Sequence, residues 1–335
     1  MKFSKLLPVL IPVVLLSLTS CKQSKEYKVI DGFTQGTTYH IVYEYASADS
    51  LNNIVDSILV AIDNSLSVYN NKSIISAVNR NEEVALDTLF INVFNRSVEI
   101  TKISNGAFDI SAAPFFDIWG FGFKNKESVT DQKLDSIKAF TGMDKIKIEN
   151  GKVVKTDPRV TINVNAIAQG YTADVIAQEF DRRGIENYLV EIGGEIMCKG
   201  KNSRGELWTI AIDKPVDGNN IPGQDIQDIV ELTGRGLATS GNYRKYYEEN
   251  GEKFSHTIDP STGKPVKHNL LSATVIAKDA MTADAMATVL MVVGLDKAKE
   301  ILAADATMDA YLVYSEQGVF KVYKTEGVQI RQTKK

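Results

Sequence analysis

The chain has 335 residues, of which 44% are hydrophobic and 24% are charged, and its net charge is −4. This length is enough to bury a sizeable core in one large domain or in two closely joined ones. The slight acidity and the lack of a basic stripe argue against a nucleic-acid-binding protein, because such proteins use clustered lysine and arginine to displace counterions from phosphate.

The first twenty residues have the pattern of a bacterial lipoprotein signal. Lys2 and Lys5 precede an apolar run at residues 6–18, which has signal-peptide length and is too short for a comfortable membrane span. Small side chains then stand directly before Cys21. This pattern predicts cleavage after residue 20, lipid attachment to Cys21 and a polar tether at residues 21–28. The alternative is a plain secretory signal with an incidental cysteine.

A lipid on Cys21 would place the protein in the bacterial cell envelope, on the periplasmic side of the inner or the outer membrane. Two or more acyl chains, at about 0.8 kcal/mol per buried methylene, give stable anchoring. The residue after Cys21 is Lys22 and not aspartate, which is compatible with outer-membrane sorting. Cys198 is then the only free thiol, so no intramolecular disulfide is possible and the fold must rest on its core.

The N-terminal part of the chain is predicted to contain a hairpin and two helices. Residues 31–45 alternate and are rich in β-formers, which indicates a hairpin edge. Apolar residues at helical spacing predict helices at 50–66 and 87–104, the second with Gly106 as its C-cap. Tyr69 follows the first helix, and its ring could stack on a ligand or pack in the core.

Aromatic residues and glycine interleave after the second helix. Ala-Phe-Asp at 107–109 is followed by Trp-Gly-Phe-Gly at 119–122, which suggests either a wall for a flat ligand or a packed, irregular loop. Residues 123–160 are charged and are expected at the periphery, with a short helix near 131–141 and a hairpin around Asn150.

A strand that runs into a helix is predicted at residues 161–183. Asn163, Ala166 and Gln169 lie at this junction, and Gly184 closes the helix. Backbone amides and a helix N-terminus at such a junction can hold phosphate. The segment is not a P-loop, because the glycine spacing and the lysine are absent.

The C-terminal half is predicted to contain mainly strands. A strand at 188–192 leads into a pair of glycines, and a hairpin through 208–213 is followed by a loop rich in glycine, proline and asparagine. Residues 237–244 could present hydroxyl groups and Arg244 to a ligand, and Gly294 separates two helices. Further strands are predicted at 272–277, 309–314 and 318–324.

A histidine and an oxygen-ligand pair lie near one another in this half. His256 precedes the turn-forming segment at 259–263, so it is expected at the end of a strand beside a rigid corner. Beyond it, Thr282 is the expected N-cap of a helix on which Asp284 and Thr288, four residues apart, share one face. Such a carboxylate and hydroxyl suit Mg²⁺, which completes its shell with water and substrate phosphate. Alternatively, Thr288 bonds back to the carbonyl of residue 284, and Asp284 merely stabilises the first helical turn.

Taken together, these segments resemble the ApbE-type FAD:protein FMN transferases, which are commonly bacterial lipoproteins or secreted proteins. The matching segments occur in the family's order over the mature chain, residues 29–330. They are Gly36-Thr37, 66–69, 106–109, 119–122, 163–174, 193–195, 238–243, 256–263 and 284–288. The resemblance implies an α+β fold, with mixed or antiparallel sheets and flanking helices around a deep FAD pocket, and Mg²⁺ at the diphosphate.

The resemblance also implies a reaction and a partner. Family members cleave FAD and transfer FMN through a phosphoester bond to a threonine or serine hydroxyl of a partner flavoprotein subunit, and AMP is released. The acceptor segment is typically Ser/Thr-Gly-Ala-Ser/Thr. This chain contains no such segment, so it is expected to be the donor enzyme. A Mg²⁺-dependent FAD pyrophosphatase that releases free FMN and AMP, or a non-enzymatic flavin-binding lipoprotein, are the alternatives.

Carried over by position, Asp284, Thr288 and the carbonyl of Ala166 resemble the family's metal ligands. His256 is the expected catalytic base for the acceptor hydroxyl. Expected contacts to the flavin or nucleotide, besides His256, are Gln35, Tyr69, Ala107, Phe108, Asp109, Asn163 and Gln169.

The chain departs from the family pattern at two of these positions. Many relatives carry aspartate at position 163 and lysine or glutamate at 169. Asn163 and Gln169 could therefore weaken Mg²⁺ binding or change how FAD is held. The two other histidines, His40 and His268, are expected to be structural.

Overall fold

A computed structural model describes residues 26–47, 50–122, 128–216, 218–219, 221, 223–242, 246–249 and 252–332 of the protein. Cys21, the signal segment before it and Arg244 lie outside the described residues. The first strand begins at Glu26, so residues 26–28 belong to the fold rather than to the tether in which the sequence placed them. Within the described ranges, no helix is long and apolar enough to cross a membrane.

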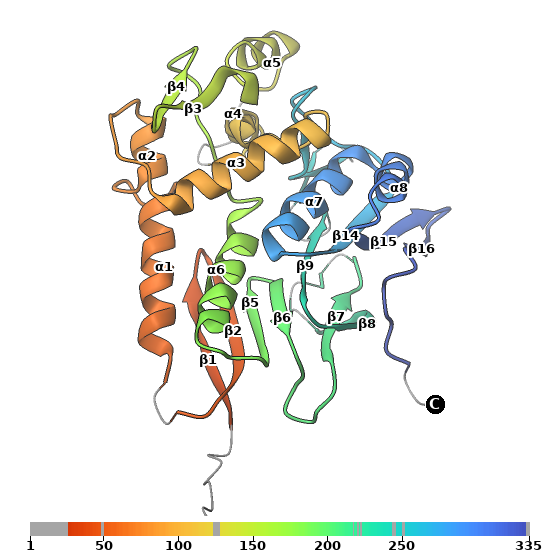
Figure 1. The fold of residues 1–335 in the computed structure, drawn as a ribbon. Coiled ribbons are helices and arrows are strands. Elements are labelled where there is room, and N and C mark those ends of the chain that lie inside the picture. Colours follow the sequence, from red (N-terminus) through yellow and green to blue (C-terminus); the bar gives the residue numbers. More distant parts are fainter. Residues whose placement is uncertain are drawn as a thin grey trace, which may run out of the picture.

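An eight-stranded sheet forms the centre of the molecule (Figure 1). Its order is β1-β2-β5-β6-β9-β14-β15-β16, and every neighbouring pair is antiparallel. The predicted N-terminal hairpin is confirmed, and Gln35 and Gly36 form its turn with φ values of 49° and 75°. The strands are β1 Glu26–Thr34, β2 Thr37–Tyr45, β5 Tyr188–Ile192, β6 Glu195–Lys199, β9 Arg235–Gly241, β14 Leu270–Ala277, β15 Asp309–Glu316 and β16 Val319–Lys324.

Helices cover one face of this sheet (Figure 1). α6 packs on β5 and β6, and α7 packs on β9 and β14. α1 then packs against α6, and α3 packs against α7. Ala283, Ala285 and Ala287 of α7 are fully buried, and their small side chains let this helix approach its neighbours closely. The helices are α1 Asn52–Leu66, α3 Thr88–Ile103, α6 Ala168–Arg182, α7 Ala280–Val293 and, after Gly294, α8 Leu295–Ala304.

The opposite face is covered by a two-stranded sheet, β7 Trp208–Asp213 and β8 Ile226–Leu232. Apolar side chains of both sheets form a second core, which includes Cys198, Ile212 and Tyr311. Burial raises the pKa of the free Cys198 thiol to about 12, which keeps it protonated and unreactive. The predicted α+β class, with antiparallel sheets and flanking helices, is confirmed.

Smaller elements surround these layers. The short helix and the hairpin predicted within 123–160 are confirmed as α5 Asp131–Lys138 and the β3–β4 pair, Ile146–Glu149 and Lys152–Lys155. Helix α2, which no sequence pattern predicted, is capped by the side chain of Ser73. The remaining elements are α2 Ile74–Asn79, η1 Ile110–Ala112, α4 Ala113–Ile118, η2 Met143–Lys145, β10 Tyr246–Glu249, β11 Glu252–Ser255, β12 Ile258–Asp259 and β13 Lys264–Pro265.

Residues 161–164 do not form the predicted strand, because a side chain takes the place of a strand partner. Asn79 Nδ2 donates to the Ile162 carbonyl at 2.9 Å, and Asn79 Oδ1 accepts from the Ile162 amide at 2.8 Å. These two bonds satisfy the backbone of Ile162 without a ladder. Two further predictions are wrong in detail: α3 is capped by Ser104 rather than by Gly106, and residues 237–241 lie within strand β9 instead of following a strand.

Candidate active site

Asp284 and Thr288 lie on one face of α7, as their spacing predicts. The helix is capped by Asp279, whose side chain accepts from the Thr282 amide at 2.7 Å, so the prediction of Thr282 as N-cap is wrong. The sequence offered two possible N-caps, because aspartate at 279 caps a helix as well as threonine at 282 does. Asp284 therefore lies one turn inside the helix, where its carboxylate does not cap the first turn.

The contacts of this pair point away from α7 toward its neighbours. Asp284 is 6% exposed, and its Oδ2 accepts from the Gly170 amide of α6 at 3.2 Å. The Thr288 hydroxyl lies 3.4 Å from the hydroxyl of Ser240 on β9. The two side chains thus face polar groups of α6 and β9, and neither is directed into hydrocarbon.

The start of α6 presents a backbone carbonyl to the same region. Gly170 is the third residue of α6, so its amide has no carbonyl partner within the helix. Here that amide donates to Asp284, while the next amide, that of Tyr171, bonds to Ile167 in the usual way. Ala166 precedes the N-cap, Ile167, so its carbonyl takes no part in the helical hydrogen bonds of α6, and it lies four residues before the amide that binds Asp284.

This donor set fits a hard divalent cation. A carboxylate, a hydroxyl and a backbone carbonyl are the oxygen ligands that Mg²⁺ accepts when it shares its shell with water and phosphate. Among the residues that the structure describes, no group of three or more His, Cys, Asp or Glu side chains could hold a metal. A site at Asp284 would therefore depend on neutral oxygen atoms and on the substrate to complete the shell.

Burial disfavours the ionised form of the acids in this region. Desolvation raises the pKa of Asp284, and the Gly170 amide opposes that shift only in part. Desolvation also raises the pKa of Asp174 on α6 to about 7, against two backbone hydrogen bonds that lower it. A cation held at Asp284 would favour its ionised form, since opposite charge counteracts desolvation.

Three of the predicted contacts gather around the first turns of α6. Gln35, in the β1–β2 turn, donates through Nε2 to the Thr172 hydroxyl at 2.7 Å. A Cβ built on Gly193, in the β5–β6 turn, would lie 3.1 Å from Gln169 Nε2. Asn163 Oδ1 accepts from the Asn165 amide at 2.8 Å, which shapes the loop before the helix.

Tyr69 also reaches this loop. Its ring is 73% exposed, and its hydroxyl accepts from Asn165 Nδ2 at 3.3 Å. The alternative of core packing for Tyr69 is therefore wrong, and its ring is open to contact with a ligand. An exposed aromatic side chain beside a helix N-terminus suits a bound ring system.

Residues 107–109 have different surroundings, with Phe108 in the core and Asp109 at the start of a short helix. Phe108 is in the core at 2% exposed, and its amide donates to the Ser104 hydroxyl at 3.1 Å, so the residue is not open to a ligand. Ala107 packs partly against the same core. Asp109 caps the short helix η1 by accepting from the Ser111 amide at 2.7 Å, and burial raises its pKa. The Asn163 amide donates to the Ile110 carbonyl at 2.8 Å, which joins this segment to the start of α6.

His256 directly follows β11, at the strand end where the sequence predicts it. Its ring lies 6.4 Å from that of Phe121, edge to face. Trp119 Nε1 donates to the Gly263 carbonyl at 2.8 Å, so the segment at 119–122 packs on the corner that follows His256. The next strand, β12, packs against α7 and brings this corner to the helix of Asp284.

The prediction that His40 and His268 are structural agrees with their contacts. His268 Nε2 bonds to the Met291 carbonyl at 2.7 Å, near the C-terminal end of α7. His40 Nδ1 bonds to Asp31 Oδ1 at 2.5 Å across the β1–β2 hairpin. Both histidines therefore hold elements of the fold together.

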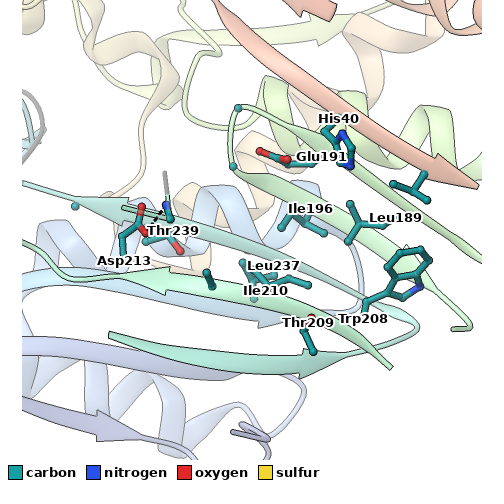
Figure 2. Close-up of a pocket in the computed structure, with 16 residues that line it drawn as sticks. His40, Leu189, Glu191, Ile196, Trp208, Thr209, Ile210, Asp213, Leu237 and Thr239 are labelled. Atoms are coloured by element: carbon teal, nitrogen blue, oxygen red, sulfur yellow. Dashed lines mark hydrogen bonds between the residues drawn. The ribbon is translucent and has the colours of Figure 1, made fainter. Parts of the chain in front are cut away.

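A cavity of 380 Å³ lies on the other face of the sheet, between the central strands and β7 (Figure 2). Its lining includes His40, Glu191, Trp208 and Thr239. Side chains alternate along a strand, so Thr239 of β9 faces this cavity while Ser240 faces Thr288. The cavity is therefore separated from Asp284 and Thr288 by the sheet.

The sequence did not single out two residues of this region, Gly170 and Asp174, whereas Ser240 lies in the segment 237–244 whose hydroxyl groups were expected near a ligand. Gly170 and Asp174 are four residues apart, a helical spacing that places them on one face of α6. That spacing is the only local signal, because their partners on α7 lie more than a hundred positions along the chain.

Comparison with known proteins agrees with this arrangement. The ApbE family model matches residues 35–312. The FAD:protein FMN transferase of Vibrio cholerae serotype O1 is 36% identical, over 92% of this chain and 94% of its own length. That of Haemophilus influenzae is 35% identical, over 89% of each.

Solved structures give the same result. The flavin transferase ApbE from Vibrio cholerae superposes with a TM-score of 0.80 at 33% identity, covering 90% of this chain and 98% of its own. The apo form of the flavinyl transferase ApbE from Pseudomonas stutzeri superposes with a TM-score of 0.81 at 30% identity, covering 90% and 95%. The family resemblance of the sequence is thereby confirmed, and the chain belongs to the ApbE family.

Proposed function

We propose that this protein is a Mg²⁺-dependent FAD:protein FMN transferase. It cleaves FAD, passes FMN to a serine or threonine hydroxyl of a partner flavoprotein and releases AMP. The observation that carries the proposal is the meeting of α6 and α7, where the buried Asp284 accepts from the Gly170 amide, four residues after Ala166. The flavin-transferase names of relatives at 30–36% identity support the choice of substrate.

Asp284, Thr288 and the Ala166 carbonyl would hold Mg²⁺. When bound, the ion neutralises charge on the diphosphate and steadies the AMP leaving group. The exposed ring of Tyr69 and the polar side chains of Gln35 and Gln169 would position the rest of the dinucleotide. Phosphoryl-type transfer depends mainly on such positioning and charge neutralisation.

His256 would act on the acceptor. Its neutral imidazole takes the proton from the acceptor hydroxyl as the hydroxyl oxygen forms its bond to the FMN phosphorus. The bond from that phosphorus to the bridging oxygen breaks, and AMP leaves with this oxygen and its electron pair. General-base assistance of this kind contributes about 10²–10⁴-fold.

The acceptor is proposed to be a polypeptide with a Ser/Thr-Gly-Ala-Ser/Thr segment. The test incubates the protein with FAD, Mg²⁺ and a purified acceptor domain that carries this segment, and follows the acceptor mass. A gain of one FMN, with equal AMP release, is the expected result. An acceptor in which both hydroxyl residues are alanine is the matched control and should gain nothing.

Two other outcomes would replace the proposal. Free FMN released at the same rate with or without acceptor would indicate an FAD pyrophosphatase, with water as the acceptor. FAD that survives prolonged incubation with Mg²⁺ and acceptor would indicate a flavin-binding protein without this activity.

We also propose that the mature chain is anchored to a membrane of the bacterial cell envelope through lipid on Cys21. The small residues before this cysteine support cleavage there. Four residues lie between Cys21 and Glu26, where β1 begins, and the five steps along the chain, at about 3.6 Å each, span at most about 18 Å. The catalytic domain would then act close to the membrane surface. Cys21→Ser should move the protein from the membrane fraction to the soluble fraction, and unchanged fractionation would contradict the anchor.

A further inference from the structure

The N-terminus of α7 is held by a carboxylate from another helix. Asp174 of α6 is 5% exposed, and its Oδ1 accepts from the Ala280 amide and its Oδ2 from the Met281 amide, each at 2.8 Å. The first amides of a helix have no partner within it, and the helix dipole favours an anion there. Of these amides, the N-cap Asp279 accepts a hydrogen bond from that of Thr282, and Asp174 accepts from those of Ala280 and Met281.

Two contacts one turn apart join α6 to α7. Gly170 and Asp174 are four residues apart on α6, and Ala280 and Asp284 are four apart on α7. Asp174 bonds to the start of α7, and the Gly170 amide bonds to Asp284. About 6 Å of helix separates the two contacts, so a displacement of α7 at Asp174 should also displace Asp284.

Glycines bring the backbones close at the same place. A Cβ on Gly170 would lie 2.3 Å from the Ala280 carbonyl oxygen and 2.9 Å from Asp284 Cβ. A Cβ on Gly236 of β9 would lie 2.2 Å from the Ala280 nitrogen. The start of α7 is therefore confined between α6 and the sheet, with no room for a side chain on either side.

The small residues of α7 around Asp284 give the polar contact a larger part in setting the position of this segment, although Met286 and Leu290 are also buried in the core. Three of the residues that flank Asp284 on this helix are fully buried alanines. Side chains of this size form only low ridges, which constrain sliding and rotation less than large interlocking side chains do. A carboxylate that binds two successive amides fixes both the axial position and the rotation of the helix.

We propose that Asp174 is a positioning residue for the divalent cation. It holds α7 where the oxygen atoms of Asp284 and Thr288 face the Ala166 carbonyl. The inference rests on the proposed function, because it takes these three residues as the metal ligands. Asp174 itself contacts neither metal nor substrate.

The test measures Mn²⁺ binding to the full chain, without FAD or acceptor, by the loss of the free-ion electron paramagnetic resonance signal. Asp174→Asn keeps the size of the side chain but sets an NH₂ group against a backbone amide. We expect its dissociation constant for Mn²⁺ to rise about tenfold or more, as is typical when a group that orients a ligand is lost. Activity should recover as the metal concentration is raised.

Asp279→Asn is the matched control. It removes the same charge from the same end of α7, but asparagine is as good an N-cap as aspartate. Its Mn²⁺ affinity should stay within about twofold of the wild type, since the cap hydrogen bond is retained. An equal loss in both variants would mean that charge, and not position, sets the affinity, and would overturn the inference.

A second variant covers the case in which Asp174→Asn does not fold. Gly236→Ala presses on α7 from the sheet side and leaves every carboxylate in place, and it should also weaken Mn²⁺ binding. Unchanged affinity in the folded variants, with only a lower melting temperature or a smaller active fraction, would make Asp174 a purely structural residue. A wild type that binds no Mn²⁺ would instead reject the metal assignment of the proposed function, and this inference with it.

Discussion

The layers on the two sides of the central sheet bury different kinds of side chain. On one side, α6 and α7 bury the carboxylates of Asp174 and Asp284, which are 5% and 6% exposed. On the other side, β7 and β8 contribute buried apolar residues such as Ile212 and Val230. Strand β9 serves both faces, because its side chains alternate between them. Burying a carboxylate costs free energy unless hydrogen bonds or a cation offset the loss of water.

This difference separates function from stability. The core under β7 and β8 gains stability because its apolar side chains exclude water. The cavity of 380 Å³ on the same side is lined partly by polar residues such as His40 and Glu191, but by none of the residues proposed to hold Mg²⁺ (Figure 2). The helix-covered face retains polar groups that a stable core does not need. Substitutions on the two faces should therefore act on different measured quantities.

The largest effect is expected from Asp284→Ala. The variant loses the only carboxylate of the proposed metal set, so flavin transfer should fall below detection and Mn²⁺ binding should be lost with it. The measurement is acceptor mass gain, alongside the same binding assay. Thr239→Val on the opposite face of the sheet is the control and should retain activity, and full turnover by Asp284→Ala would refute the metal assignment.

A smaller loss is expected from His256→Gln. Removing the base should lower kcat for transfer about 10²–10⁴-fold. Mn²⁺ affinity should change little, because His256 is not among the proposed metal ligands. Single-turnover kinetics with bound FAD measures the transfer step directly. His40→Gln is the matched histidine control, and a fall of equal size there would show that His256 has no special role.

The apolar face is probed by Ile212→Ala. Ile212 is 2% exposed in the core under β7 and β8, and truncation of such a side chain costs about 2–5 kcal/mol of unfolding free energy. Urea unfolding measures the loss. The Mn²⁺ dissociation constant of the folded fraction should remain that of the wild type. A weakened metal site would show that the two faces are coupled.

The smallest effect is the pH dependence of metal affinity. Burial raises the pKa of Asp284, so a proton competes with the cation below that pKa. Affinity should rise with pH by up to about tenfold per unit and level off once the carboxyl is ionised without metal. Titrations between pH 5 and 8, with Asp284→Asn for comparison, measure this slope. An affinity independent of pH over this range would show that the Asp284 pKa is not raised.

The same pKa shifts give the metal-free protein an opposite trend in stability. The folded pKa of Asp174, about 7, lies above its ordinary value, so the folded state binds more protons than the unfolded state between the two. The contribution of this group to stability is complete below the ordinary pKa and is lost as pH rises toward 7. Binding a cation at Asp284 should reduce the loss by stabilising the folded state.

Local patterns determined most of the elements of this protein. Helical spacing gave α1 and α3, alternation gave the β1–β2 hairpin, and glycine marked the break between α7 and α8. The four-residue spacing of Asp284 and Thr288 placed them on one face, since a helix repeats every 3.6 residues. The family resemblance followed from the order of such segments along the chain.

Only the tertiary structure decided which distant groups meet. The bond of Asp174 to α7 spans 106 positions, that of Gly170 to Asp284 spans 114, and that of Asn79 to Ile162 spans 83. No local period encodes these contacts, because they depend on how whole helices pack against the sheet. For this reason the local pattern predicted a strand at 161–164, where the structure has none. The sequence also could not show that Asp174 binds the start of the helix that carries Asp284.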